Sequence, residues 1–162
     1  MQFIHYFFDP VTLDVLVKLF WAMSFGMIIG VERLFAHKTA GMRTYALVSM
    51  GSALFVIIAA IVSQSLTGAD FDPFRVAAQI IAGIGFLGTG MIVTQGVHVT
   101  GLTSATGMWV AAGIGMATGF GLYNVAIIAT VLTLFVFIVL WFIEQQLRRV
   151  RGFIEHEEDQ KK

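Results

Sequence analysis

The chain has 162 residues, and its composition differs from that of soluble domains of this length. Hydrophobic residues make up 57% and charged residues 12%, against about 45–50% and about 25% in typical soluble domains. From Val76 to Ile143 the chain holds no Asp, Glu, Lys or Arg, and a soluble domain cannot bury so long a run without a polar face. These features exclude a soluble enzyme, a disordered protein and a nucleic-acid-binding protein, and they predict a membrane protein.

Few residues carry charge or chemical reactivity. Ten Lys and Arg residues balance ten Asp and Glu residues, so the net charge gives no reason to expect nucleic acid as a partner. The chain has no cysteine, which excludes disulfides, iron–sulfur clusters and thiolate metal sites. The sequence shows no Ser/His/Asp arrangement and no metal-ligand spacing. We therefore expect the lipid bilayer as a partner, no enzymatic activity and no bound cofactor.

The hydrophobic pattern predicts an all-α, polytopic membrane bundle of about five transmembrane helices. A spanning helix needs about 20 mostly apolar residues, and the uncharged run would be roughly 100 Å long as a single helix. It must therefore fold back twice, with loops expected at 95–101 and 119–124, where polar and glycine residues cluster. The predicted spans are 11–31, 44–66, 76–94, 103–119 and 122–143. Residues 1–143 then form one transmembrane domain, followed by a short tail, 144–162.

Basic residues predict the orientation of the bundle. The first loop carries Arg33, Lys38 and Arg43, and further basic residues gather in the tail, whereas no Lys or Arg precedes Asp14. Because cytoplasmic loops are enriched in Lys and Arg, we expect the N-terminus outside and the C-terminus in the cytoplasm. Asp14 and Lys18 lie four residues apart in the first span, so they can pair on one helix face or extend to the interface.

Small residues recur every four positions in two of the predicted helices. These residues are Ala22, Gly26 and Gly30 in the first helix, and Thr103, Gly107, Ala111, Gly115 and Gly119 in the fourth. Such stripes let a second helix approach closely. Packing between helices of this chain is the favoured interpretation. A contact surface between copies in a homo-oligomer is the alternative.

The third predicted helix contains four glycines in a short stretch, Gly83, Gly85, Gly88 and Gly90. This stretch matches G-x-G-x-x-G, but no strand context precedes it and no acidic residue follows before Glu144, so a dinucleotide site is rejected. Glycine weakens a helix, and freed backbone groups in a bilayer must be covered by protein or line a cavity. We expect either the tightest packing point of the bundle or a broken helix that lines a pathway.

Polar residues gather at two helix ends. Glu32 and Arg33 close the first predicted helix, and Arg43 and Thr44 open the second. They are either positive-inside charges with an ordinary ion pair, or a polar cluster that gates or recognises a ligand at the cytoplasmic face. At the opposite face the third helix begins with three candidate functional residues, Asp72, Arg75 and Gln79. There Asp72 lies near the positive end of the helix dipole.

Taken together, these motifs resemble the MgtC/SapB family of bacterial inner-membrane proteins. The resemblance rests on five stretches: 26–33 (GMIIGVER), 40–44 (AGMRT), 83–90 (GIGFLGTG), 101–106 (GLTSAT, with Thr103 and Thr106) and the Trp109 that follows, and 119–123 (GFGLY) extends it. The family's usual Gly-Leu-Thr-Thr-Ala-Ala and Gly-Ala-Gly are altered at 101–106 and 88–90. Longer members carry a soluble C-terminal domain, for which this chain has no room.

The resemblance implies a multi-pass inner-membrane protein of magnesium homeostasis, in which Mg²⁺ is a substrate or a signal. Transport of magnesium is one implied activity. The alternative is a non-transporting regulator that binds another membrane complex through small-residue helix faces. Mg²⁺ sites usually contain carboxylates, and the predicted second to fifth helices have no acidic residue between their ends. The residues therefore favour the regulator, whereas the resemblance favours transport.

Overall fold

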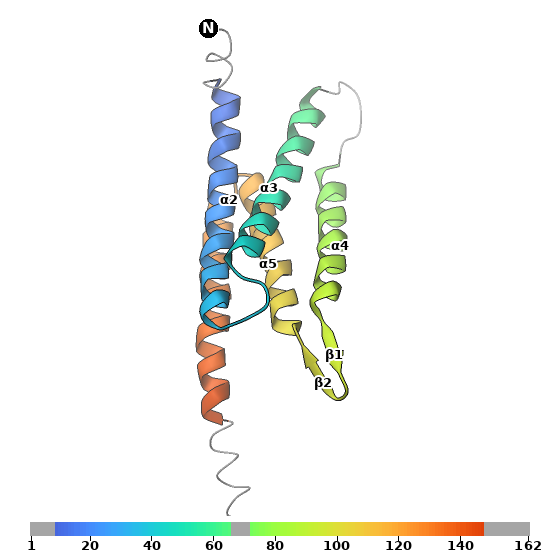
Figure 1. The fold of residues 1–162 in the computed structure, drawn as a ribbon. Helices are drawn as coiled ribbons and strands as arrows, with labels where there is room; N and C mark the ends of the chain where they lie inside the picture. Colours follow the sequence, from blue (N-terminus) through green and yellow to red (C-terminus); the bar gives the residue numbers. More distant parts are fainter. Residues whose placement is uncertain (1–8, 66–71, 148–162) are drawn as a thin grey trace, which may run out of the picture.

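The computed structural model describes residues 9–65 and 72–147, and nearly all of them are helical (Figure 1). Five α-helices lie within these ranges: α2 (Pro10–Phe35), α3 (Met42–Ser65), α4 (Pro73–Met91), α5 (Leu102–Gly119) and α6 (Tyr123–Phe135). A π-helical turn, η1 (Val136–Leu140), continues α6 directly, and helix then runs to residue 147. The predicted all-α bundle is confirmed. Most of the predicted tail, 148–162, lies outside the described residues.

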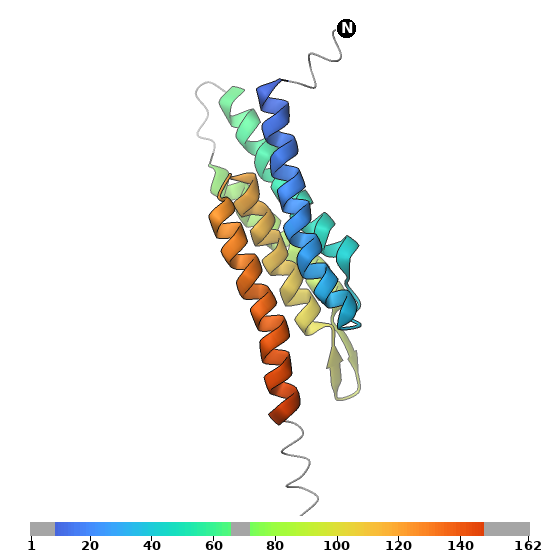
Figure 2. The same ribbon diagram turned by 90° about the vertical axis from the view of Figure 1, so that its left-hand side faces the viewer.

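Four of these helices are long and apolar enough to cross a membrane. They are Pro10–Phe35, Met42–Gln64, Phe74–Met91 and Tyr123–Leu147. α5 does not meet the same criterion of length and composition, although its 18 residues reach about 27 Å at 1.5 Å per residue. Its position explains the difference, because α5 contacts all four other helices and lies between α2 and α6 in Figure 2. A helix enclosed by protein needs small side chains more than it needs lipid-facing apolar ones.

The predicted break at 95–101 is confirmed, and it contains a short β-hairpin that the sequence analysis did not predict. α4 ends at Met91, and strands β1 (Val93–Gln95) and β2 (His98–Thr100) pair antiparallel, with Val93 opposite Thr100. Gly96 has a φ of +59°, a left-handed conformation suited to a two-residue hairpin turn. Alternation of β-branched and polar residues through this stretch is a strand pattern that the polar composition concealed. The predicted break at 119–124 is confirmed, since the chain turns between α5 and α6 at Gly121.

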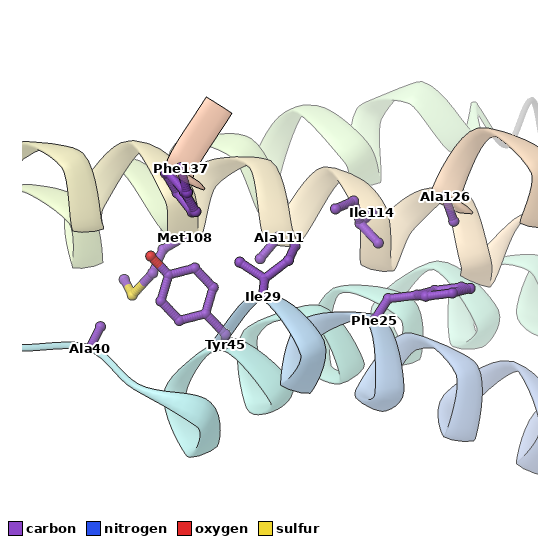
Figure 3. Close-up of a cluster of buried hydrophobic side chains, with 9 residues drawn as sticks. All are labelled: Phe25, Ile29, Ala40, Tyr45, Met108, Ala111, Ile114, Ala126 and Phe137. Atoms are coloured by element: carbon purple, nitrogen blue, oxygen red, sulfur yellow. The ribbon is translucent and has the colours of Figure 1, made fainter. Parts of the chain in front are cut away.

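The buried core joins α2, α3, α5, α6 and η1. Figure 3 shows Ile29 and Phe25 of α2 facing Ala111 and Ile114 of α5, with the Tyr45 ring from α3 pointing toward Met108. α4 is more peripheral, because only 11% of its most apolar segment is buried in the bundle. The central helices therefore form one compact unit, with α4 against its side.

Glycine stripes in α2 and α5 explain how these helices come so close to α3. A Cβ atom added at Gly26 would collide with the carbonyl oxygen of Tyr45, and one at Gly30 would lie 2.5 Å from the Cα of Met42. A Cβ added at Gly115 would collide with the backbone carbonyl of Ser49. Packing within the chain, the favoured interpretation of both stripes, is therefore confirmed at these positions.

Candidate functional site

Arg33 is the buried charge around which the candidate site is built. It lies in the last turn of α2, where the helix dipole favours a cation, and only 2% of the residue is exposed. Its Nε donates a hydrogen bond to the Glu32 carboxylate, and the two form an ion pair. An ionisable side chain inside a membrane helix is costly unless it is paired. The pair therefore makes the burial of Arg33 tolerable.

The ring of Phe137 lies under the Arg33 guanidinium. The guanidinium carbon is 3.5 Å from the ring centroid, which is a cation–π contact. Phe137 belongs to η1, where the helix widens to π geometry. Such turns occur often at functional sites because they shift the direction of the side chains that follow. The widened turn is thus located where α6 meets the buried arginine.

Tyr45 connects α3 with α5 at the same level of the bundle. The residue is fully buried, and its hydroxyl donates a hydrogen bond of 3.1 Å to the carbonyl oxygen of Ser104. Gly107 of α5 leaves the space for this arrangement, since a Cβ there would lie 2.5 Å from the Tyr45 hydroxyl and 2.7 Å from the Phe137 ring. Side chains from α2, α3 and η1 therefore meet beside the backbone of α5 at this level of the bundle.

A cavity opens at this end of the bundle, where the α2–α3 loop and the hairpin also lie (Figure 1). Its volume is about 810 Å³. Arg33 lines it together with His37, Lys38 and Thr39 of the loop and with Thr103 and Ser104 at the start of α5. η1, the helical turns that follow it and residues of the hairpin complete the wall. We call this space the Arg33 cavity.

The predicted polar cluster of Glu32, Arg33, Arg43 and Thr44 forms only in part. Glu32 and Arg33 are paired, whereas Arg43 and Thr44 are exposed in the first turn of α3 and do not line the Arg33 cavity. The cause is the rotation of α3 about its own axis, which turns Tyr45 toward the core and leaves Arg43 and Thr44 on the exposed side. The candidate residues of α5 are also separated. Thr103 lines the Arg33 cavity. Thr106 is exposed and its hydroxyl donates to carbonyl oxygens of its own helix, and Trp109 is half exposed.

At the start of α4, Asp72 has a structural role. It is the N-cap, and its Oδ1 accepts a 2.9 Å hydrogen bond from the backbone N–H of Phe74. Arg75 and Gln79 are exposed on the same helix. The structure therefore does not bring these three residues to Arg33, because α4 begins at the opposite end of the bundle (Figure 1).

Both expectations for the four glycines of α4 were wrong. The helix is continuous from Pro73 to Met91, so it is not broken. A Cβ at Gly83, Gly85 or Gly90 would find no atom within 4 Å, and only Gly88 touches a neighbour, Ala105, at an ordinary 3.6 Å. The stretch is therefore not the tightest packing point of the chain. Closest approach occurs at the glycines of α2 and α5.

One open glycine of α4, Gly83, lines a second hollow, which we call the α3–α4 groove. Its volume is about 810 Å³, and its walls are almost entirely apolar. Gly51, Ser52 and Phe55 are among its residues from α3, and Gln79, Gly83 and Leu87 among those from α4.

The predicted pairing of Asp14 with Lys18 is confirmed. Their side chains form an ion pair at 2.6 Å on α2, as their four-residue spacing predicts.

Comparison with known proteins identifies the family. The sequence model of the MgtC family matches residues 19–146, which include Arg33, the Arg33 cavity and the α3–α4 groove. The chain belongs to the MgtC family. Protein MgtC of Brucella abortus (strain 2308) is 48% identical over 83 residues, 51% of this chain and 33% of that protein. Protein MgtC of Salmonella typhimurium (strain LT2) is 43% identical over 89 residues, 55% of this chain and 36% of that protein.

The MgtC relatives are longer than the matched region. The chain aligns with about a third of the length of each of them, and no solved structure gives a significant match. The resemblance read from the sequence motifs is therefore confirmed as membership of the MgtC family. Together with four helices apolar enough to span a bilayer, it identifies a membrane protein.

Sequence reasoning missed Tyr45, Ser104 and Phe137 as parts of the site. Tyr45 directly follows the Ala-Gly-Met-Arg-Thr stretch, and a polar aromatic residue in an apolar span was a signal that could have been used. Phe137 is one of fifteen phenylalanines, and nothing in the sequence distinguishes it from the others. Its contact with Arg33 depends on how α6 is rotated.

Proposed function

We propose that this MgtC family member acts in magnesium homeostasis in the bacterial inner membrane by binding a transmembrane helix of another membrane protein. The α3–α4 groove is the proposed binding surface. In this proposal the chain does not conduct the ion, has no enzymatic activity and holds no resident cofactor, and Mg²⁺ acts as the signal to which the system responds. Transport of magnesium by the chain is the alternative.

The open glycines in the groove are the observation that carries the proposal. Gly51 of α3 and Gly83 of α4 face the groove, and a Cβ at either would meet no atom within 4 Å. In a bilayer, helices associate through close backbone approach at small residues, because the apolar surfaces gain little by leaving lipid. Glycines that none of the described helices covers leave room for a helix from another protein.

Gln79 adds a polar contact to this surface. Its side chain is exposed and lines the otherwise apolar groove between two membrane-spanning helices. An uncharged polar side chain in such a position favours a hydrogen bond across a helix interface. Gln79 would therefore add directional affinity to the packing supplied by the glycines.

The distribution of charges supports binding more than conduction. Mg²⁺ prefers oxygen ligands, commonly carboxylates. In the parts of the chain that the structure describes, no three His, Asp or Glu residues are grouped to hold a metal ion. The deepest charge in the bundle is the Arg33 cation, which repels Mg²⁺. These observations favour a regulator over a conventional magnesium pore.

A pair of substitutions on one helix tests the groove. Gly83→Leu fills the groove, whereas Gly85→Leu adds the same side chain to an open position of α4 that does not line it. We expect Gly83→Leu to abolish support of growth at low magnesium at normal protein levels, while Gly85→Leu retains it. Equal activity of the two variants would overturn the groove as the binding surface.

Magnesium flux separates the two candidate functions. The cysteine-free wild-type chain, purified and placed in liposomes with an internal magnesium dye, should give no flux above that of empty liposomes.

Cross-linking in cells tests the partner. A single cysteine at position 83 should cross-link to a protein of different mass, whereas a single cysteine at position 85 should not. Measurable flux would refute the non-transporting form of the proposal, and a cross-link only between identical chains would identify a homo-oligomer instead.

A further inference from the structure

The Arg33 cavity combines features that suit an anionic ligand. Its wall includes Arg33, almost fully buried, and Lys38 and His37 from the adjoining loop. The cavity is roughly the size of known small-ligand sites, about 300–1,000 Å³. It lies outside the α3–α4 groove, with which it shares no lining residue. Binding of a ligand in the Arg33 cavity is therefore independent of binding of a helix in the α3–α4 groove.

Arg33 has hydrogen-bonding capacity that the protein leaves unused. Its Nε is taken by Glu32, and its guanidinium face lies on Phe137. Among the residues that the structure describes, its terminal nitrogens Nη1 and Nη2 have no hydrogen-bond partner. A guanidinium presents its donors as a planar fork that matches the oxygens of carboxylates and phosphates. The unused edge of a buried arginine in a cavity wall indicates an oxyanion ligand.

The start of α5 contributes further donors at the same cavity. Leu102, Thr103 and Ser104 form its first turn and all line the cavity. Their N-cap residue is Gly101, so no side chain caps these backbone N–H groups. The first N–H groups of a helix point along the axis and carry its positive dipole end, which makes them donors for phosphate oxygens. These donors and Arg33 face one space from two different helices.

Negative charges near the cavity do not cancel this preference. Glu32 neutralises part of the Arg33 charge but is not among the cavity-lining residues. Glu144 does line it, in the helical turns that follow η1, and it makes an interaction of its own. Lys38 forms no ion pair with any residue that the structure describes, and together with the α5 dipole it adds positive potential on the loop side. The electrostatic preference is thus for an anion held between the loop and α5.

Part of the remaining wall is apolar. Val99 of the hairpin, Leu102, Leu140 and Trp141 all line the cavity, and Trp141 is half exposed. Tryptophan is enriched where membrane proteins meet lipid headgroups. We infer that the Arg33 cavity binds a phosphate group, either that of an anionic phospholipid headgroup with its acyl chain along the apolar wall, or a free phosphate from solution.

Lipid binding by the full chain in detergent tests this inference. Native mass spectrometry should show phosphatidylglycerol retained in preference to phosphatidylcholine, because only the first carries a net negative charge. Lys38→Gln should weaken phosphatidylglycerol binding about threefold, the range of an exposed charge contact. Arg33→Gln should weaken it about tenfold, since it removes a charge-assisted hydrogen bond in a buried site.

Two further variants keep the test decisive if Arg33→Gln fails to fold. Thr103→Phe changes no charge but fills the cavity, and it should abolish the lipid preference. Arg43→Gln removes a positive charge at the same end of the bundle but outside the cavity, and it should leave the preference unchanged.

Competition by millimolar inorganic phosphate would identify free phosphate as the ligand, whereas lipid binding that resists phosphate would identify the lipid. Equal retention of both lipids without phosphate binding, or an unchanged preference in Lys38→Gln and Thr103→Phe, would overturn the inference.

Discussion

Arg33 lies one residue from its carboxylate partner, in a turn where neighbouring side chains point away from each other on an ideal helix. The pair forms because the Phe137 ring covers the guanidinium and the surrounding helices exclude water, leaving 3% of the Arg33 side chain and 17% of the Glu32 side chain exposed. Desolvation is costly for each charge, and only the partner offsets that cost. Removing either partner should therefore matter more than removing an exposed charge nearby.

This reasoning predicts the effect of Glu32→Gln. The substitution leaves the buried Arg33 cation without a counter-charge, and we expect it to destabilise the bundle by about 3 kcal/mol. Thermal unfolding of the purified protein in detergent measures the change. Arg43→Gln is the matched control, because Arg43 is exposed at the same end of the bundle, and it should melt close to the wild-type temperature. A drop of similar size in the control would contradict a special role for the pair.

At the scale of single helices, the glycines of one helix differ in whether a neighbouring helix packs against them. α5 carries glycines on both its protein-facing and its open sides, and the four-residue stripe of small residues includes Gly115 but not Gly113. Gly115 meets the Ser49 carbonyl of α3, whereas a Cβ at Gly113 would find nothing within 4 Å. The Ser49 hydroxyl is fully buried and without a hydrogen-bond partner in the described part of the chain.

A pair of alanine substitutions on α5 tests this distinction. We expect Gly115→Ala to destabilise the protein by about 2 kcal/mol, because the added methyl group separates α3 from α5. Gly113→Ala should change stability by about 1 kcal/mol or less, in the stabilising direction, because alanine is the better helix former. Melting temperatures of the two variants in the same detergent provide the comparison. Equal losses in both variants would show that helix approach does not limit stability here.

Across the whole molecule, the arrangement places at the centre α5, the one described α-helix that is not among the four candidate membrane spans. α5 contacts every other helix, and the polar Arg33 cavity and the apolar α3–α4 groove lie on different sides of it. The α2–α3 loop and the hairpin lie at the same end, while the α5–α6 turn lies at the other (Figure 1). The basic residues of the sequence predict that the loop end faces the cytoplasm.

Cysteine labelling tests this orientation without background, because the native chain has no cysteine. Lys38→Cys in the loop and His98→Cys in the hairpin should react with an impermeant maleimide only after the membrane is opened. Asn124→Cys, near the α5–α6 turn, should react in intact spheroplasts. All three positions are exposed. The opposite labelling pattern would invert the predicted topology, and labelling of positions 38 and 98 from different sides would contradict the fold.

The sequence by itself determined that the chain is a helical membrane protein of the MgtC family, because hydropathy and motif spacing are local properties. It also indicated the Asp14–Lys18 pair, since four residues is one helical turn. Only the tertiary structure decided that three of the four glycines of α4 have no neighbour within reach of an added Cβ, why Arg43 and Thr44 stand apart from Arg33, and that Phe137 covers the guanidinium. Those outcomes depend on the rotation of each helix about its axis. The packing of all the helices together sets that rotation, and no single stretch of residues encodes it.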